Sequence, residues 1–308
     1  MRKIVLTSVD SGSAHACGLA VGLKKHGKLT VVWQNKNLHN LDAVYNKQYR
    51  AHYGFSKLPR SADDLIIVAC ITWDRLKQHF GVRFKTWLMG FGRVHIIVSD
   101  GRFARNPRYY NREFEGHDVL TTGCKRHFRE PLPVKTYYQP FDFSEIDCRK
   151  FTNLTVGHSP FVQKKFREKG TNRITLTVKE RGLNYDLITG VPWMECIKRK
   201  ARCHIFIDQV EHYALKKFRF KTGDYIWPAL GKSGIEAMHL GCCVMTYGKG
   251  YDTDIPAPPV AWTTTEDFWM NFDSLLASPE KRQTLAQQQY EWALTYATPE
   301  FASKQVLK

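Results

Sequence analysis

One segment of the sequence combines a glycine turn, a helix start and an acidic side chain. It runs Gly-Lys-Ser-Gly-Ile-Glu-Ala-Met-His-Leu-Gly-Cys-Cys-Val from Gly231 to Val244. We predict a helix that begins near Ser233, and the N–H groups at a helix N-terminus can bind phosphate. Glu236, one turn into this helix, can accept hydrogen bonds from a ribose diol. Taken alone, Glu236 is better explained as an acidic residue that stabilises the helix dipole.

The sequence indicates neither a P-loop nor a metal site. Gly231-Lys232-Ser233 matches the end of a P-loop, but Ile226 stands where that motif requires glycine. The single Asp-x-Asp sequence, Asp252-Thr253-Asp254, lies in a proline-rich loop and is typical of a turn. None of the eight cysteines forms a Cys-x-x-Cys pair, which disfavours a zinc ribbon.

A carboxylate follows a buried strand in the first half of the chain. The sequence Val98-Ser99-Asp100-Gly101 places Asp100 just after that strand. Parallel α/β sheets carry their chemistry at the carboxyl ends of strands, so Asp100 can serve as general base on an acceptor hydroxyl. An Asx turn that closes the strand explains this residue equally well.

A basic and aromatic segment comes directly after Asp100. Arginines that hold phosphates, interleaved with rings that stack on bases, are typical of a nucleic-acid groove. Because Asn106 precedes a proline, we expect the segment to form an irregular loop. A solvated basic face, or attraction to anionic lipid headgroups, is the alternative. The residues assigned to the acceptor are Arg102, Arg105, Arg108, Tyr109 and Arg112, with Lys125 and Arg126 in a second cluster.

The charge of the chain points to an anionic partner. Lys and Arg total 46 against 29 Asp and Glu, a net charge of +17. Residues 1–150 hold 25 of the basic and 13 of the acidic residues, so most of the excess lies in the first half. Residues 75–93 are rich in aromatic side chains, which fits either a membrane-surface helix or core packing. No apolar run reaches the ~18 residues that a membrane span needs.

The hydrophobic pattern predicts two α/β halves in the 308 residues, about twice the ~150 typical of one domain. Residues 4–6, 14–25 and 29–33 form a strand, helix and strand, a unit that implies a parallel sheet. Further strands are expected at residues 65–69, 94–98, 119–121 and 134–138. In the second half, strands are expected at residues 154–156, 174–178, 186–189, 203–207, 243–246 and 260–262. The predicted domains are residues 1–150 and residues 151–308, the second with terminal helices.

The second half carries an ordered set of motifs. They are Val156-Gly157-His158-Ser159-Pro160, Lys169-Gly170-Thr171, Gly190-Val191-Pro192, Ile205-Phe206-Ile207-Asp208-Gln209 and the segment Gly231–Val244. The set resembles the C-terminal half of GT-B glycosyltransferases, especially the group-1, family-4-like branch. The resemblance implies two Rossmann-like α/β domains that face each other across a cleft. It also implies a nucleoside-diphosphate sugar, UDP-sugar first, as donor substrate, with no metal and no permanently bound cofactor.

The resemblance assigns the phosphate side of the donor site residue by residue. Lys169 corresponds to the lysine that neutralises the donor diphosphate, with His158 and Ser159 near the same phosphates. Ser233 and Gly234 would face the phosphates from the helix start. His158 stands where many relatives carry arginine.

The nucleoside side of the site follows in the same way. Gly190 and Val191 correspond to the loop whose backbone holds the base, and Glu236 to the acid that binds the ribose. The family often has another glutamate eight residues before this one, where Pro228 stands here. The sequence therefore departs from the family on the side that contacts the sugar.

The first half matches GT-B enzymes only in layout. Gly12 and Ser13 lie in the first loop, which in this fold faces the cleft and the donor. The setting of Asp100, a strand-end carboxylate before a basic loop, is similar to that in phage DNA β-glucosyltransferases.

The sequence therefore predicts transfer of a sugar from a nucleotide sugar to a hydroxyl of a large anionic acceptor. Duplex DNA with hydroxymethylated pyrimidines is the first choice, in the cytoplasm, or the host cytoplasm for a phage-encoded enzyme. A membrane-surface enzyme that acts on a lipid-linked or envelope saccharide is the alternative. A non-catalytic nucleic-acid-binding protein on a GT-B scaffold is the third hypothesis. No obligate protein partner is indicated.

Overall fold

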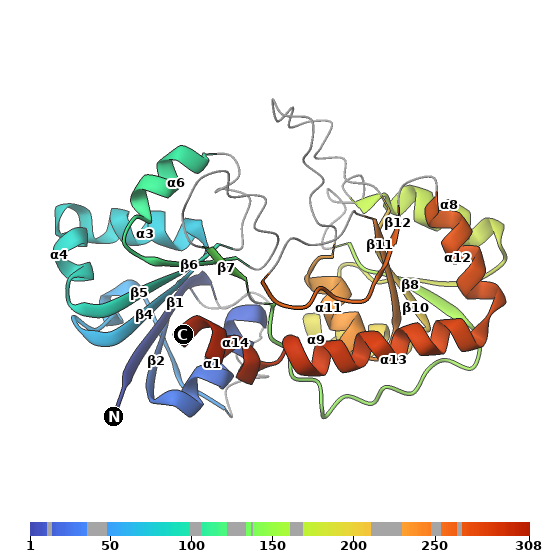
Figure 1. Cartoon of the computed structure of the whole chain (residues 1–308), viewed down its shortest axis with the longest axis horizontal. Helices are drawn as coiled ribbons and strands as arrows, with labels where there is room; N and C mark the ends of the chain where they lie inside the picture. Colours follow the sequence, from blue (N-terminus) through green and yellow to red (C-terminus); the bar gives the residue numbers. More distant parts are fainter. Residues whose placement is uncertain are drawn as a thin grey trace. The chain divides into compact units, whose positions relative to one another are not determined.

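The computed structural model covers the 308-residue chain. It describes residues 1–10, 14–35, 48–98, 106–121, 134–136, 138–160, 169–210, 230–247, 254–263 and 267–308. Figure 1 shows the course of the chain through these elements.

The chain forms two compact units. The first consists of residues 1–142, 252–256 and 296–308, and the second of residues 143–251 and 257–295. The division thus differs from the predicted boundary at 150/151, and the last helix belongs to the first unit. That helix, α14 (Pro299–Leu307), packs against α1 (Ala14–Leu23). A Cβ built on Gly22 would lie 1.9 Å from the Pro299 carbonyl oxygen, so only glycine permits this approach.

The first unit is built on a seven-stranded sheet in which every strand pairs in parallel. Its order, β3-β2-β1-β4-β5-β6-β7, contains the 3-2-1-4-5-6 order of Rossmann folds. The second halves of β4 and β5 are buried and mostly apolar, as a parallel sheet covered on both faces requires. The strands are β1 Lys3–Asp10, β2 Lys28–Asn35, β3 Ala51–Tyr53, β4 Ala62–Val68, β5 Phe91–Val98, β6 Asp118–Thr121 and β7 Val134–Thr136.

Helices α3 (Cys70–Phe80) and α4 (Phe84–Leu88) connect β4 to β5 and form part of the core. Trp73 packs edge-on against Phe84 with ring centroids 5.0 Å apart, and Trp87 packs against Phe91 in the same way at 4.9 Å. Core packing, rather than a membrane-surface helix, therefore explains the aromatic side chains of residues 75–93. Among the described residues, no helix combines the length and the apolar character that crossing a bilayer would require.

The second unit has a five-stranded parallel sheet in the order β12-β11-β10-β8-β9. Its strands are β8 Thr155–His158, β9 Asn184–Leu187, β10 Ile205–Gln209, β11 Cys243–Tyr247 and β12 Ala261–Thr263. Its helices are α8 Thr171–Glu180, α9 Trp193–Ala201, α11 Lys232–His239, α12 Asp267–Ala277 and α13 Pro279–Tyr296.

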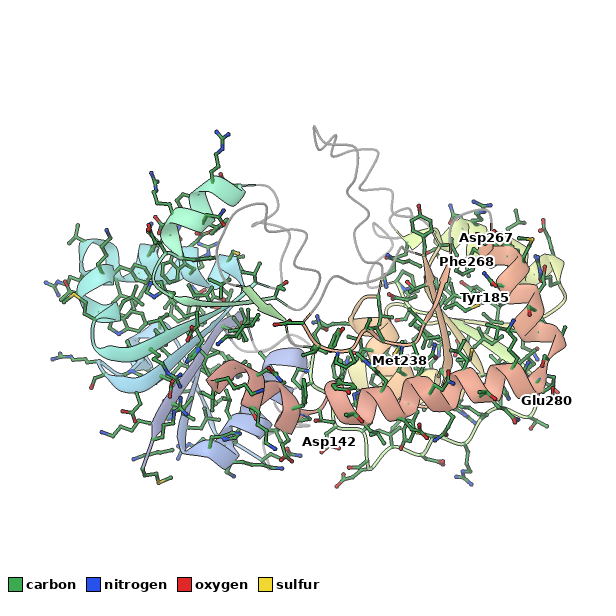
Figure 2. The ribbon with its side chains drawn as sticks, in the orientation of Figure 1. Asp142, Tyr185, Met238, Asp267, Phe268 and Glu280 are labelled. Atoms are coloured by element: carbon green, nitrogen blue, oxygen red, sulfur yellow. The ribbon has the colours of Figure 1, made fainter. Side chains whose placement is uncertain are left out.

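The core of the second unit joins this sheet to the C-terminal helices. Phe268 of α12 is buried in this core, and Tyr185 of β9 packs against it from the sheet (Figure 2). Gln289 fastens α13, the long red helix of Figure 1, to β11. Its amide oxygen accepts from Val244 N at 2.7 Å and its amide nitrogen donates to Val244 O at 2.9 Å.

The predicted strand at residues 174–178 is wrong, because these residues lie in α8. Their β-branched side chains favour a strand on local propensity. The buried positions of the segment are Thr171, Ile174 and Val178, a helical spacing that presents one face to the core. Tertiary packing therefore outweighs the local preference.

Candidate functional site

The strand order of the second sheet reverses between β8 and β10. The chain forms β9 on one side of β8 and then returns to place β10 on the other side. In open parallel sheets, ligands bind outside the carboxyl ends of the strands at such a switch point. His158 ends β8, and Asp208 lies near the end of β10. The motifs of the second half therefore meet at the position where this fold binds ligands.

His158 holds three elements together. Its ring is fully buried, and Nδ1 donates to the Ile207 carbonyl oxygen at 2.7 Å. Nε2 therefore accepts from Thr171 Oγ1, 2.8 Å away. Burial, with the nearby charge of Lys169, lowers the pKa of His158 to about 4, so the ring is neutral at pH 7. Both ring nitrogens of His158 contact protein groups in this structure, and its place near the donor phosphates stays a prediction.

Ser159 follows β8 and lies beside α9. Its Oγ is 3.3 Å from Cys196 Sγ. The Ser159 hydroxyl thus contacts a thiol in this structure, and its place near the donor phosphates stays a prediction.

Lys169 and Asp208 form an ion pair at the switch point. Lys169 Nζ lies 2.6 Å from Asp208 Oδ1, and the Lys169 side chain is 18% exposed, whereas the Asp208 side chain is fully buried. The other carboxylate oxygen, Oδ2, accepts from Gly231 N at 2.6 Å. The lysine predicted to bind the donor diphosphate thus lies at the switch point, where its ammonium group is paired with the Asp208 carboxylate.

Helix α11 begins one residue earlier than predicted, at Lys232, with Gly231 as its N-cap. Two glycines allow this helix to start against β10. A Cβ built on Gly231 would lie 3.3 Å from Asp208 Oδ2, and one on Gly234 would lie 2.3 Å from Leu230 Cδ1. Ser233 is partly exposed in the first turn. The start of α11 therefore lies directly against the end of β10.

Glu236 is buried in the second turn of α11, with 5% of its surface exposed. Its Oε1 accepts from the indole N–H of Trp193 at 3.0 Å, and its Oε2 pairs with the ammonium of Lys200. Lys200 is 1% exposed. Burial lowers the pKa of Lys200, but the nearby acidic groups, the Glu236 carboxylate foremost, together raise it by more, so the pKa lies above its usual value. The carboxylate predicted to bind ribose is thus held in a fixed orientation by two side chains of α9.

The loop of Gly190 and Val191 connects β9 to α9. Gly190 has φ = 69°, a left-handed conformation that favours glycine, and it is exposed. Trp193 begins α9 three residues later and reaches Glu236. The structure therefore brings this loop close to the acid of α11, although the two are more than forty residues apart in the sequence.

Lys200 and Trp193 are the site residues that the sequence did not indicate. Lys200 lies in the run Lys198-Arg199-Lys200, which is typical of a solvated helix end. Asp208 belongs to one of the sequence motifs, but the motif alone does not indicate a role for it. Its position in an otherwise apolar strand was the signal, since a buried carboxylate needs a partner.

The electrostatic field of the site joins these groups. The charges of Lys169, Asp208 and Lys200 all act on the pKa of His158, and Asp208 also acts on Lys200. The two ion pairs, Lys169–Asp208 and Lys200–Glu236, place two positive charges against two negative charges. These four groups together have no net charge.

Several predicted site residues lie outside the described residues. They are the candidate base Asp100, the donor-loop residues Gly12 and Ser13, and the acceptor candidates Arg102, Arg105, Lys125 and Arg126. Pro228 is also outside them. Among the residues that the structure does describe, no group of three or more His, Cys, Asp or Glu side chains is arranged to hold a metal ion.

The described part of the basic segment is a helix, not the predicted irregular loop. Asn106 is non-helical, as expected before proline, but Pro107 occupies the first turn of α6 (Pro107–Glu113). Proline is favoured there because it needs no hydrogen bond to its nitrogen. Arg108 and Arg112 are exposed one turn apart on this helix.

Helix α6 is fixed to α3 by its other side chains. Tyr110 donates from its hydroxyl to Asp74 Oδ2 at 2.8 Å, and Lys77 Nζ lies 2.7 Å from Glu113 Oε2. Tyr109 is partly buried against the core, and its hydroxyl accepts from Lys77 Nζ at 3.3 Å. Tyr109, which the sequence assigns to the acceptor, is thus partly covered in this structure, whereas the two arginines are presented to solvent.

No protein-family model matches this sequence, and no curated protein matches it. Solved structures do match over the whole chain. Anabaena Alr3699/HepE in complex with UDP-glucose is 13% identical with a TM-score of 0.65, covering 100% of this chain and 98% of that one. The chain has the GT-B fold. Two parallel sheets with the strand orders given above agree with this assignment.

Two further GT-B structures match at similar levels. An α-glucosyltransferase in complex with UDP and a 13-mer DNA containing an HMU base is 11% identical with a TM-score of 0.55, and all of both chains is covered. The catalytic domain of starch synthase IV from Arabidopsis thaliana, bound to ADP and acarbose, is 10% identical with a TM-score of 0.54, again with full coverage of both chains. At these identities the likeness concerns the fold.

Proposed function

We propose that this GT-B protein transfers a sugar from a UDP-sugar to a hydroxyl of a large anionic acceptor. The observation that carries the proposal is the meeting of Lys169, the start of α11 and Glu236 at the switch point of the second sheet. Structures of the same fold that bind UDP-glucose, UDP or ADP support a nucleotide donor.

In this proposal the second unit holds the donor. Glu236 accepts hydrogen bonds from the ribose diol, since each carboxylate oxygen has a lone pair beyond the one used by Trp193 or Lys200. The loop of Gly190 and Val191 holds the base. Lys169 and the helix dipole of α11 stabilise the negative charge that develops on the leaving diphosphate. Sugar transfer then needs only a base for the acceptor hydroxyl, the role proposed for Asp100.

We further propose hydroxymethylpyrimidine DNA as the acceptor. The excess of basic residues in the first half and the exposed pair Arg108 and Arg112 support an acceptor with many phosphates. The α-glucosyltransferase structure with HMU-containing DNA supports it by likeness of fold.

The test is a transfer assay analysed by mass. The protein is incubated with UDP-sugars and duplex DNA that contains hydroxymethylated pyrimidines. The DNA is then digested to nucleosides, whose masses are measured by mass spectrometry. A gain of one sugar per modified nucleoside is the expected result, and unmodified DNA of the same sequence is the control. Turnover of the UDP-sugar without nucleoside modification would contradict DNA as the acceptor but would still support a glycosyltransferase. DNA binding without any turnover of a nucleotide sugar would favour a non-catalytic nucleic-acid-binding protein.

A further inference from the structure

A carboxylate, that of Asp208, lies at the place proposed for the donor diphosphate. We propose that Asp208 is an internal competitor, whose carboxylate occupies the phosphate partners until the nucleotide donor displaces it. This inference rests on the proposed function, because it concerns the same donor site. It assigns Asp208 a role in setting donor affinity.

The contacts of Asp208 are those that a phosphate group would make. One carboxylate oxygen lies 2.6 Å from Lys169 Nζ, and the other accepts from Gly231 N at 2.6 Å. The carboxylate thus bridges a cation and a main-chain N–H at the start of α11, the two kinds of group that bind phosphate in proteins. Since Gly231 is the N-cap and has no side chain, it cannot supply a capping oxygen of its own.

Charge explains why this arrangement affects affinity. Lys169 is neutralised by Asp208 while Lys200 is neutralised by Glu236, so the cluster offers a diphosphate no net positive charge. Asp208 is fully buried, so water screens its charge poorly. A diphosphate that approaches Lys169 must either break the Lys169–Asp208 pair or bind beside an uncompensated carboxylate. Both alternatives weaken binding.

A purely structural role for Asp208 predicts the opposite result. If Asp208 served only to orient Lys169 and the turn at Gly231, its loss would misplace both groups and weaken nucleotide binding. The sign of the change in affinity therefore separates the two roles.

The experiment compares Asp208→Asn with the native chain by calorimetric titration of UDP and of uridine. Asparagine keeps the shape and an oxygen for Gly231 N–H but removes the charge. We expect the Kd for UDP to fall about tenfold, equivalent to about 1.4 kcal/mol, while the affinity for uridine stays unchanged. Asp273→Asn, which removes the same charge from an exposed pair with Arg181, is the matched control and leaves both affinities unchanged.

Weaker or unchanged UDP binding by Asp208→Asn would overturn the proposal and leave the donor site itself standing. Equal gains for UDP and uridine would also overturn it, because the effect would not depend on phosphate. If Asp208→Asn melts well below the native chain, Asp208→Ser provides a second neutral side chain with an oxygen, and the same increase is expected. If the native chain binds no nucleotide, the proposed function fails, which is a different outcome from failure of the Asp208 role.

Discussion

Replacing Glu236 by alanine tests both the stability and the chemistry of the candidate donor site. The change removes the only carboxylate that the described contacts place on Lys200, a side chain 1% exposed. Removal of one partner from a buried ion pair costs about 3–5 kcal/mol, because the other charge is left in the protein interior. For a domain of ~150 residues this corresponds to a fall in Tm of roughly 6–20 °C. The sequence alone predicts that the fold survives this substitution, because Glu236 lies at the start of a helix and does not fill a core. Its burial beside Lys200 predicts the loss of stability instead.

The double variant Glu236→Ala with Lys200→Met separates stability from ligand binding. Methionine fills the place of the lysine side chain without a charge, so the double variant should regain most of the lost Tm. Thermal unfolding followed by circular dichroism measures this. The affinity for UDP should remain lower by about 1.5–3 kcal/mol, the range for a lost hydrogen bond to a charged group. A single variant that melts like the native chain would refute the buried pair. A double variant with native UDP affinity would refute ribose binding by Glu236.

Three further outcomes follow from the structure and the proposal. Replacing Arg108 and Arg112 by alanine should reduce the log–log salt slope of duplex DNA binding by roughly 2. The control Arg60→Ala, which changes an exposed arginine just before β4, should leave this slope unchanged. Loss of anionic-liposome binding with an unchanged DNA slope would instead indicate a membrane surface. His158, whose pKa is lowered to about 4 in the folded chain, binds a proton more readily in the unfolded chain. The free energy of unfolding should therefore rise by about 3 kcal/mol as the pH increases from about 4 to 6.5. Denaturant titrations at several pH values should show this rise for the native chain but not for His158→Gln, and parallel pH profiles would contradict it. Asp100→Asn should reduce turnover by about 10²-fold or more with nearly native UDP affinity, and near-native turnover would exclude a base role.

The general architecture could be predicted from the sequence because it depends on local patterns. The strand and helix of residues 4–6 and 14–25, and the helix that starts after Gly231, follow from apolar runs and glycine positions. The two failures also have local causes. In α8, β-branched side chains suggested a strand, and at α6 the rule for the residue before proline was extended to Pro107 itself.

The ion pairs of the site could not be predicted, because they join distant parts of the sequence. Lys200 meets Glu236 across 36 positions, and Lys169 meets Asp208 across 39. Only the order of strands around β8 brings these residues together. The sequence can therefore indicate which residue types gather at the switch point, but not which of them neutralise one another.

The position of the donor is the central claim, and hydrogen exchange with and without UDP tests it most directly. We expect UDP to slow exchange in peptides that cover the end of β10 and the start of α11, residues 205–210 and 230–240, and in the loop that contains Gly190. Peptides from the opposite ends of the strands, such as residues 150–155, should exchange at the same rate in both samples. Binding of UDP without added protection at residues 230–240 would contradict a donor site at this switch point.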